Sequence, residues 1–253
     1  MPEKPRFKII HGDCVQVENN HAHNNCHWMI YAGSGISVFQ AFNWEATPGE
    51  YRILERNNRC HDNFCTQPWV TTGKLSDGNG MIVDDMRNTQ NKSPNGVYAG
   101  RILIQNNVSY ANGGSGMHAF SSDHVDFINN TVMGNNTVMD YSQLGITQCT
   151  DCRVLNNVLV ATDNKKPVNR VNGVFSDVLV SHNLFFGGNE EHVHGEHAIV
   201  ADPKFIDAAK GDFHLRKDSP ALGSGGAWEI GVGTEGLPSR GTSNTVEFPH
   251  VTR

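Results

Sequence analysis

The sequence lacks long apolar runs, carries little charge and is poor in the residues that build helices. No stretch approaches the roughly 20 apolar residues of a membrane-spanning helix, which predicts a soluble chain with no membrane partner. Charged residues make up 18% of the 253 residues, and the enrichment in Leu, Ala, Glu and Lys that is typical of helical bundles is missing. These absences argue against an all-α fold and against a highly charged disordered chain.

Basic residues are also scarce. The chain contains 20 Lys and Arg against 26 Asp and Glu, which gives a formal net charge of −6. A nucleic-acid-binding domain usually presents a basic face, so we expect no nucleic-acid partner. Residues 1–8 include no apolar stretch of signal-peptide length, and we therefore expect no signal peptide in this chain.

Asparagine and glycine, by contrast, are abundant. The chain contains 27 Asn and 26 Gly, and both residue types tolerate a left-handed backbone. Asn-Asn pairs recur along the chain with spacings of 38, 49, 23, 27 and about 26 residues. A period of 23 to 27 residues that is twice expanded by insertion indicates a solenoid. The pairs lie at 19–20, 57–58, 106–107, 129–130 and 156–157, and His182-Asn183 takes the equivalent place.

Each repeat contains three short strands. A β-rich run precedes each Asn pair, a second run follows it, and a third opens with glycine. Three strands per turn, with the next turn about 4.8 Å away, predict an all-β fold, a parallel β-helix of about six coils. The expected Gly-opened strands begin at Gly35, Gly80, Gly116, Gly145 and Gly173.

The Asn pairs occupy the corner between the first two strands. Asn accepts a left-handed backbone, and its side-chain amide can hydrogen-bond the equivalent Asn in the coils above and below. The pairs therefore predict an Asn ladder along one edge of the solenoid, which is a structural role and not a catalytic one.

These repeats resemble the right-handed parallel β-helix proteins of the pectate lyase superfamily over roughly residues 10–220. The segment that begins at Ala201 resembles the closing coil of secreted carbohydrate-active β-helices. The resemblance implies one right-handed β-helix domain over residues 1–228, a tail over 229–253, and a monomer. Such folds usually begin with a capping helix, and the first clear strand here starts near Cys14. We therefore expect N-terminal coils and the cap to be missing, and an extracellular or periplasmic parent protein.

The cysteine spacing allows one cross-link between coils. Cys26 follows its corner Asn by six residues and Cys65 by seven, so the two lie in neighbouring coils and a disulfide between them is feasible. Cys149 and Cys152 straddle one turn, and a single Cys-x-x-Cys is a weak metal signal. Most of the thiols are expected to be reduced and buried.

Strand alternation assigns the side chains to two faces. In the Gly-opened strands it directs Phe39, Asp84, His118 and Phe120 outward, and it places no Lys or Arg on that face. Aromatic rings, a carboxylate and an imidazole on one outer surface are suited to binding sugars. The alternative is an ordinary solvated sheet face.

Two insertions directly follow these strands, at residues 41–50 and 86–100. Solenoids place insertions on one face, often the binding face. In the first insertion, Trp44 offers a stacking platform for a sugar ring. The second insertion carries Arg87, Lys92 and Tyr98.

In the superfamily that the chain resembles, substrate binds along this strand and its bordering loops, and cleavage is a calcium-assisted β-elimination. The resemblance therefore implies a pectate- or alginate-like uronic-acid polysaccharide as substrate, bound along residues 77–101 with His118 beside them. For elimination, the uronate carboxylate must be neutralised, a base must remove the adjacent proton, and the leaving oxygen must be protonated.

The candidate residues for these tasks come from the same segment. Asp77, Asp84 and Asp85 supply the hard oxygen ligands that Ca²⁺ prefers. Lys92 and His118 are the candidate bases, and Arg87 is the candidate clamp for the carboxylate. The candidate substrate-binding residues are Phe39, Trp44, Tyr98, Arg101 and Phe120.

Two other functions remain open. β-Helix glycoside hydrolases such as polygalacturonases use clustered Asp, and Asp84-Asp85 resembles their paired acids, but their Asn-Thr-Asp, Gly-His-Gly and Arg-Ile-Lys signatures are absent. The second alternative is a non-catalytic β-helix with a carbohydrate-binding or structural role.

The histidine-rich stretch 192–197 contains metal-ligand residue types without the helical His-Glu-x-x-His spacing, so we expect a solvated loop there.

Overall fold

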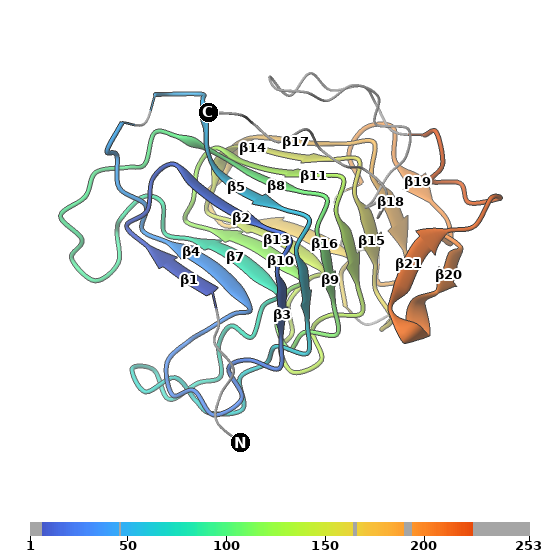
Figure 1. Ribbon diagram of the computed structural model, residues 1–253, viewed down its shortest axis with the longest axis horizontal. Helices are drawn as coiled ribbons and strands as arrows, with labels where there is room; N and C mark the ends of the chain where they lie inside the picture. The colour runs from blue at the N-terminus through green and yellow to red at the C-terminus, as the bar shows by residue number, and fades with distance from the viewer. Residues whose placement is uncertain (1–6, 46, 164–165, 190–193, 225–253) are drawn as a thin grey trace.

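Figure 1 shows a computed structural model of the protein, which describes residues 7–45, 47–163, 166–189 and 194–224. The chain winds into stacked coils, and each complete coil adds one strand to each of three parallel sheets. No helix in these ranges has the length and apolar character needed to cross a membrane.

We name the three sheets A, B and C in the order in which each coil visits them. Sheet A contains β1 (Phe7–Ile10), β4 (Ile36–Phe39), β7 (Met81–Asp84), β10 (Met117–Phe120), β13 (Leu144–Thr147) and β16 (Asn169–Asn172). Sheet B contains β2 (Val15–Glu18), β5 (Tyr51–Arg56), β8 (Arg101–Gln105), β11 (Val125–Ile128), β14 (Thr150–Leu155) and β17 (Ser176–Ser181). Sheet C contains β3 (His21–His23), β6 (Arg59–His61), β9 (Val108–Tyr110), β12 (Thr131–Met133), β15 (Val158–Val160), β18 (Leu184–Phe186) and β19 (Ile199–Val200).

This arrangement confirms the predicted right-handed parallel β-helix, with three short strands per coil and about six coils. Equivalent residues of successive coils are in register, as where Met117 pairs with Met81 on one side and with Leu144 on the other. Apolar side chains from all three sheets therefore stack in columns inside the coils and form one continuous core. Burial of this core, at about 25 cal/mol per Å² of apolar surface, is the main driving force for folding.

The Asn pairs lie in the turn from sheet B to sheet C and form the predicted ladder. The first residue of each pair has a left-handed backbone, with φ between 55° and 58°. The second donates its side-chain amide to the side-chain oxygen of the next coil at 3.0–3.1 Å. The ladder residues are Asn20, Asn58, Asn107, Asn130, Asn157 and Asn183.

A second ladder, which the sequence analysis did not predict, runs along the turn from sheet C to sheet A. Its side-chain hydrogen bonds are 2.8–3.0 Å long, and a glutamine takes the place of Asn in the last step. The two ladders fix two corners of the coils and so hold the strands between them in register. The second ladder consists of Asn25, Asn63, Asn112, Asn135 and Gln143.

Sheet A differs from the prediction at both ends. It begins one coil earlier than expected, with β1, and it ends with β16 instead of a strand opened by Gly173. Gly173 follows β16 with a φ of 73° and turns the chain toward sheet B. In this coil glycine ends the strand, and alignment on glycine therefore misplaced it. Lys8 on β1 and Arg170 on β16 point outward, so this face carries two cations on strands that the alignment on glycine did not include.

The segment that resembles a closing coil takes a different form. It is an antiparallel hairpin that packs on the outer face of sheet C, where Phe205 and Leu215 contact an apolar cluster that includes Val158 and Leu184. The hairpin lies beside the stack in Figure 1. The tail predicted for residues 229–253 lies outside the described residues. The elements of the hairpin are β20 (Phe205–Asp207), the 3-10 helix η1 (Ala208–Lys210) and β21 (Asp212–Leu215).

One ionisable side chain lies inside the coils. Glu55 is fully buried on β5, in a column where Val17 and Ile104 occupy the equivalent positions of the neighbouring coils. Neither carboxyl oxygen has a hydrogen-bond partner among the described residues. Because burial disfavours the charged form, the pKa of Glu55 rises from 4.5 to about 8, and the side chain is neutral at neutral pH.

Asn130 provides a test of the first ladder. Its amide donates to Ile104 O at 2.9 Å and to Asn157 Oδ1 at 3.0 Å, and its Oδ1 accepts two hydrogen bonds from Asn107. Asn130→Ala leaves these buried groups unpaired, so we expect the free energy of unfolding in urea to fall by about 2–4 kcal/mol. The adjacent Asn129 has a left-handed backbone and a side chain with no hydrogen bond to the described residues. Asn129→Gly should therefore cost less than about 1 kcal/mol, and equal losses would contradict the ladder.

Glu55 makes stability depend on pH. Between its ordinary pKa of 4.5 and its folded pKa of about 8, the folded state holds a proton that the unfolded state has lost. Unfolding therefore becomes easier as the pH rises through this window, by about 1.4 kcal/mol per pH unit from this group. Glu55→Gln should remove that slope in urea titrations at a series of pH values. A variant with the same slope as the wild-type protein would show that Glu55 is ionised in the fold.

Candidate functional site

A cleft of about 1020 Å³ lies over the outward face of sheet A, and we name it the sheet A cleft. Two columns of side chains form its floor, because alternate residues of each strand point away from the core. The first column contains Lys8, Ser37, Ile82, His118, Gly145 and Arg170. The second contains Phe39, Asp84, Phe120, Thr147 and Asn172.

The floor changes in charge along the axis of the helix. Lys8 and Arg170 lie on the first and last strands of sheet A, roughly 24 Å apart at the 4.7–4.9 Å spacing of neighbouring strands. Between them, Asp84 is flanked in register by Phe39 on one side and Phe120 on the other. The cleft therefore offers cations at its ends and aromatic rings beside a carboxyl group near its middle.

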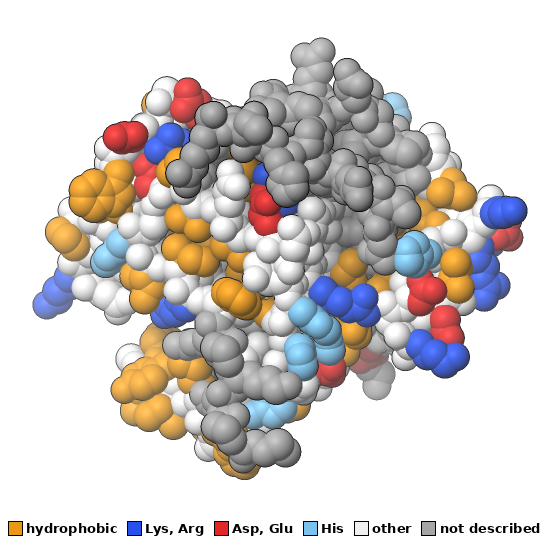
Figure 2. Space-filling view, viewed as in Figure 1, with side chains coloured by type: hydrophobic (Ala, Val, Ile, Leu, Met, Phe, Trp, Pro, Cys, Tyr) orange, Lys and Arg blue, Asp and Glu red, His pale blue; other side chains and the backbone are white. Residues whose placement is uncertain are grey.

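The walls of the cleft come mainly from three loops that run from sheet C to sheet A, over residues 24–35, 62–80 and 134–143. The first two form an apolar lobe, visible at the lower left of Figure 2. Tyr31 and Trp69 from this lobe line the cleft, as does Tyr141 from the third loop. Exposed apolar side chains of the lobe include Trp28, Ile30, Tyr31 and Val70.

His118 lies half-buried on the floor between the two ends of the cleft. Burial lowers its pKa to about 4, so the imidazole is neutral at neutral pH. Gly145 on the neighbouring strand leaves room beside the ring, since a Cβ at that position would lie 3.1 Å from Cδ2 of His118. The adjacent residues Met117 and Ala119 are fully buried, and this confirms the outward face assigned to His118.

Two neighbouring side chains fix the tautomer of His118. Nε2 of His118 lies 3.1 Å from Oγ1 of Thr147, and the Thr147 hydroxyl donates its only hydrogen to Oδ1 of Asn172 at 2.7 Å. With Asn172 Oδ1 as the acceptor of the Thr147 hydrogen, Nε2 carries the ring hydrogen and donates it to Thr147. The lone pair remains on Nδ1, which has no hydrogen-bond partner in the described part of the chain. A neutral imidazole with an available lone pair is suited to act as a general base.

Asp84 and Asp77 form a pair of interacting carboxylates in the same cleft. Burial and the negative charge of Asp77 raise the pKa of Asp84 to about 7. A hydrogen bond of 3.1 Å from Gln90 Nε2 to Asp84 Oδ1 and the charge of Lys8 oppose this increase. Asp84 is therefore close to half-protonated at neutral pH, whereas most carboxyl groups are fully ionised.

Asp85, predicted as a metal ligand, is a structural residue. It is fully buried, and its Oδ1 accepts hydrogen bonds from the backbone and hydroxyl of Thr89 at 2.9 and 2.7 Å. Its Oδ2 accepts from Gln90 N at 2.7 Å and from Gln40 Nε2 at 2.9 Å. These four bonds occupy the carboxylate and hold the start of the insertion that follows it, so Asp85 is not available to a metal ion.

Arg87 and Lys92 do not line the sheet A cleft. The guanidinium of Arg87 forms hydrogen bonds of 2.8–3.2 Å with the carboxylate of Asp123 and reaches Oγ1 of Thr150 at 3.1 Å. These bonds turn Arg87 toward sheet B, which corrects its prediction as a substrate clamp. Lys92 is exposed in the insertion and does not line the cleft.

Tyr98 and Arg101 are also corrected. Tyr98 is fully buried, and its hydroxyl donates to Asp13 Oδ1 at 2.6 Å. Arg101 lies on sheet B and forms ion pairs of 2.7 Å with both Asp126 and Asp151. Both side chains are occupied inside the protein and do not reach the cleft.

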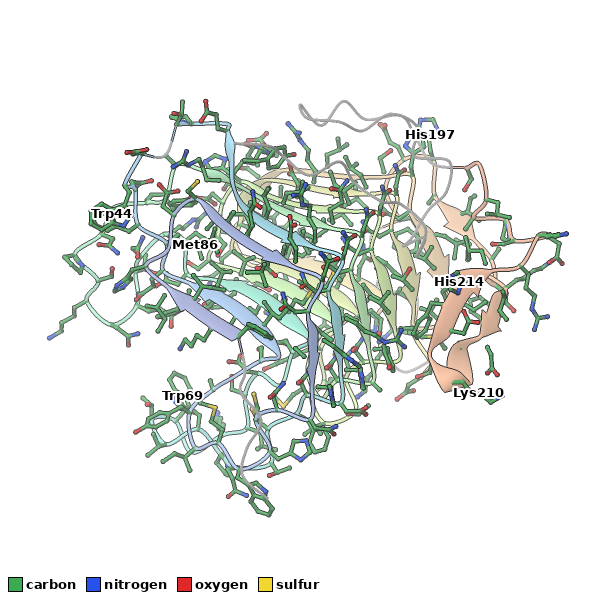
Figure 3. The ribbon with its side chains drawn as sticks, viewed as in Figure 1. Trp44, Trp69, Met86, His197, Lys210 and His214 are labelled. Atoms are coloured by element: carbon green, nitrogen blue, oxygen red, sulfur yellow. The ribbon has the colours of Figure 1, made fainter. Side chains whose placement is uncertain are left out.

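Trp44 is exposed, but it lies in the loop that follows β4, whereas Trp69 lies in the loop that precedes β7, and Figure 3 shows the two side chains well apart. The physical reason is that the two predicted insertions pack on each other. Asn43 Nδ2 donates to Val97 O at 2.8 Å and Asn43 Oδ1 accepts from Ala99 N at 2.8 Å. The insertions therefore cover the corner between sheets A and B, and only residues 89–91 of the second reach the cleft.

The sequence analysis assigned Phe39, Asp77, Asp84, His118 and Phe120 to one site, and in the structure all five line the sheet A cleft. It missed the cations Lys8 and Arg170 and the loops that carry Tyr31, Trp69 and Tyr141. One signal was available. The distance from the second run of each repeat to the Gly-opened strand varies strongly. The long loop 24–35 contains Trp28 and Tyr31, and the long loop 62–80 contains Trp69.

No group of three or more His, Cys, Asp or Glu side chains within the described residues is arranged to hold a metal ion. The histidine-rich stretch 192–197 falls partly outside those residues.

A scan against protein-family models and a search of curated proteins find no match to this chain. The fold, a right-handed parallel β-helix, is thus established by the geometry, and the function must be argued from the cleft itself.

The environment of His118 can be measured directly. We expect its imidazole to titrate near pH 4 in NMR spectra recorded across an acid titration, because the cleft floor excludes water from the charged form. Ile82→Ser, in the adjacent coil of the same column, should admit water and move the midpoint upward. A midpoint near 6.5 in the wild-type protein, the value of a solvated histidine, would exclude a buried imidazole.

Proposed function

We propose that the protein binds a uronic-acid-containing polysaccharide in the sheet A cleft and cleaves it by β-elimination. The parallel β-helix is compatible with lyases and hydrolases alike, and the proposal is carried by His118. This neutral imidazole, with its lone pair on Nδ1, lies on the floor of a cleft that has Lys8 and Arg170 at its ends. Such a substrate places the site of action in the periplasm or outside the cell.

The cleft supports binding of an extended acidic chain along the helix axis. Lys8 and Arg170 attract carboxylates at positions roughly 24 Å apart, a span of several sugar units. Phe120 on the floor and Trp69 on the wall provide apolar surfaces for the faces of sugar rings, while the ring of Phe39 lies under the ammonium group of Lys8 at 4.9 Å. The cations lie in the cleft, although the chain as a whole carries a net charge of −6.

His118 and Tyr141 are the residues to which we assign the proton transfers. Nδ1 of His118 accepts the proton from the carbon next to the uronate carboxylate, and the released electron pair forms the new double bond as the glycosidic oxygen departs. The rings of His118 and Tyr141 lie 6.4 Å apart, centroid to centroid. Burial raises the pKa of Tyr141, so its phenol stays protonated and can donate to the departing oxygen.

The calcium ion that the superfamily resemblance implies fits two of the cleft's carboxyl groups. Asp77 and Asp84 repel each other, which contributes to the raised pKa of Asp84, and a divalent cation relieves such repulsion. Both residues supply the hard oxygen ligands that Ca²⁺ prefers, and water and substrate would supply the others. When bound, the ion neutralises the substrate carboxylate and makes the neighbouring C–H more acidic.

A glycoside hydrolase is the second candidate, and Asp84 is the specific observation that favours it. A carboxyl group with a pKa of about 7 is a suitable general acid for protonating a glycosidic oxygen. Asp77, the nearby carboxylate, would then act as the base or nucleophile. In the lyase Asp84 is ionised and binds the cation, whereas in the hydrolase it must be protonated.

Product analysis separates the two activities. The purified protein is incubated with pectate, alginate and glucuronan, with calcium or with a chelator. A lyase yields an unsaturated sugar that absorbs in the ultraviolet, and a hydrolase yields reducing ends without that absorbance. If the protein binds a polysaccharide but forms neither product, both proposals are rejected and a non-catalytic carbohydrate-binding protein is supported.

Substitutions then assign the residues. We expect His118→Ala to lower kcat about 100- to 10,000-fold, as loss of a general base does, with the fold unchanged. The control is His214→Ala, which changes a histidine that does not line the cleft. Asp84→Asn should raise the calcium concentration needed for a lyase, and it should abolish the activity of a hydrolase. Full activity of His118→Ala would show that the base lies elsewhere.

A further inference from the structure

Two buried cysteines connect the loops that wall the sheet A cleft. Cys26 belongs to loop 24–35 and Cys65 to loop 62–80, and each is 3% exposed. Their thiols are within hydrogen-bonding contact of each other. Sγ of Cys26 lies 3.6 Å from Ser34 O and Sγ of Cys65 lies 3.5 Å from Gly33 O, so both sulfur atoms lie beside the same short segment.

Backbone and ladder hydrogen bonds bring the two coils together just before these cysteines. Asn25 Nδ2 donates to Asn63 Oδ1 at 2.8 Å, and Phe64 N donates to Asn25 O at 3.2 Å. Neighbouring coils are therefore in register directly before the two cysteines. Cys26 directly follows Asn25, whereas Phe64 stands between Asn63 and Cys65, so the two cysteines are offset by one residue. The contact between their thiols and their shared position beside Gly33 and Ser34 are the observations that bring the two sulfur atoms together.

The other cysteines differ in their surroundings. Cys149 and Cys152 are also in contact, but Cys149 lies in the turn from β13 to β14 and Cys152 lies on β14, so a bond between them would link one coil only to itself. Cys60 belongs to the apolar core, and Cys14 is exposed. Cys26 and Cys65 are thus the pair that joins two separate loops.

We propose that Cys26 and Cys65 form a disulfide that locks loops 24–35 and 62–80 together and holds the wall that carries Tyr31 and Trp69. The oxidant is a disulfide, either a small molecule or a thiol–disulfide oxidoreductase. One cysteine thiolate attacks it and forms a mixed disulfide, and the second thiolate then displaces the remaining thiol. The two cysteines lose two electrons, the oxidant is reduced to two thiols, and these thiols take up the two protons.

The lock adds to hydrogen bonds that already join the loops. Val70 N donates to Ile30 O at 2.8 Å, and Gly78 N donates to Gly33 O at 2.8 Å. These two hydrogen bonds bring the loops together, but water can replace either of them when the loops separate. A covalent bond across residues 26–65 closes a long stretch of chain, and such cross-links restrict the unfolded state strongly.

A peptide map of the full chain tests the bond. The protein is refolded in a glutathione redox buffer, alkylated and digested with trypsin without reduction. Cleavage at Lys8, Arg52, Arg59 and Lys74 places Cys26 in peptide 9–52 and Cys65 in peptide 60–74, and the disulfide joins them. The linked peptides should persist in Cys14→Ser and Cys60→Ala and disappear in Cys65→Ser. Separately alkylated Cys26 and Cys65 in the wild-type protein would overturn the proposal.

Melting temperature tests the locking effect separately from the bond. The comparison uses Cys149→Ser/Cys152→Ser, so that the other contacting pair plays no part. In this variant we expect oxidation to raise Tm by roughly 10 °C and to slow tryptic cleavage after the exposed Lys74 several-fold. Equal Tm and cleavage rates for the oxidised and reduced forms would refute the lock. Should the double variant fail to fold, the wild-type protein with and without reductant gives the same comparison.

Discussion

Hydrogen bonds between stacked side-chain amides hold each coil at a fixed distance and in fixed register with the next, and the rest of the molecule depends on that spacing. Each ladder amide is paired above and below, so that burying it leaves few unsatisfied groups. Because there are two ladders, two corners of the coil are fixed, and the strands between them cannot slip by one residue. The apolar columns inside and the polar columns outside both follow from this register.

The sheet A cleft is a product of the same repetition. A residue at a given position on one strand has its equivalent one coil away, so a single outward column can contain Lys8, His118 and Arg170 in a straight line. Burial lowers the pKa of His118 and so keeps it neutral, and burial together with the negative charge of Asp77 keeps Asp84 partly protonated. The pKa of His118 is lowered and that of Asp84 is raised, and both shifts favour the uncharged form. The two side chains therefore share one surface without forming an ion pair.

The sequence analysis predicted the parts of the structure that repeat locally and missed those that depend on distant coils. The pairs ending in Asn58 or Asn130 are visible because two Asn stand side by side at a regular period. In the second ladder Asn63 and Asn112 are single residues, whereas Asn25 and Asn135 stand in Asn-Asn pairs that the sequence analysis did not use. Loops of unequal length separate these ladder members from the strands that follow. Glycine was an uncertain marker of strand starts, since Gly173 ends a strand.

Arg87, Tyr98 and Arg101 were misassigned to the sheet A cleft for one physical reason. Their partners are remote in the sequence, as with Tyr98 and Asp13 or Arg101 and Asp126, and strand alternation within one repeat does not predict such contacts. Face assignment succeeded where a residue lies in the middle of a regular strand, as His118 does. It failed in the insertions, where no period sets the direction of a side chain.

The loops that wall the cleft leave the helix after one ladder position and return at the next strand, so their length does not affect the register of the coils. A frame of this kind separates two tasks. The amide ladders and the core preserve the fold, while the chain at 24–35, 62–80 and 134–143 is free to lengthen, shorten or change composition. Exchanging these segments between β-helices is thus a route to new specificity in which the floor, with its imidazole and cations, is kept and only the side walls are replaced.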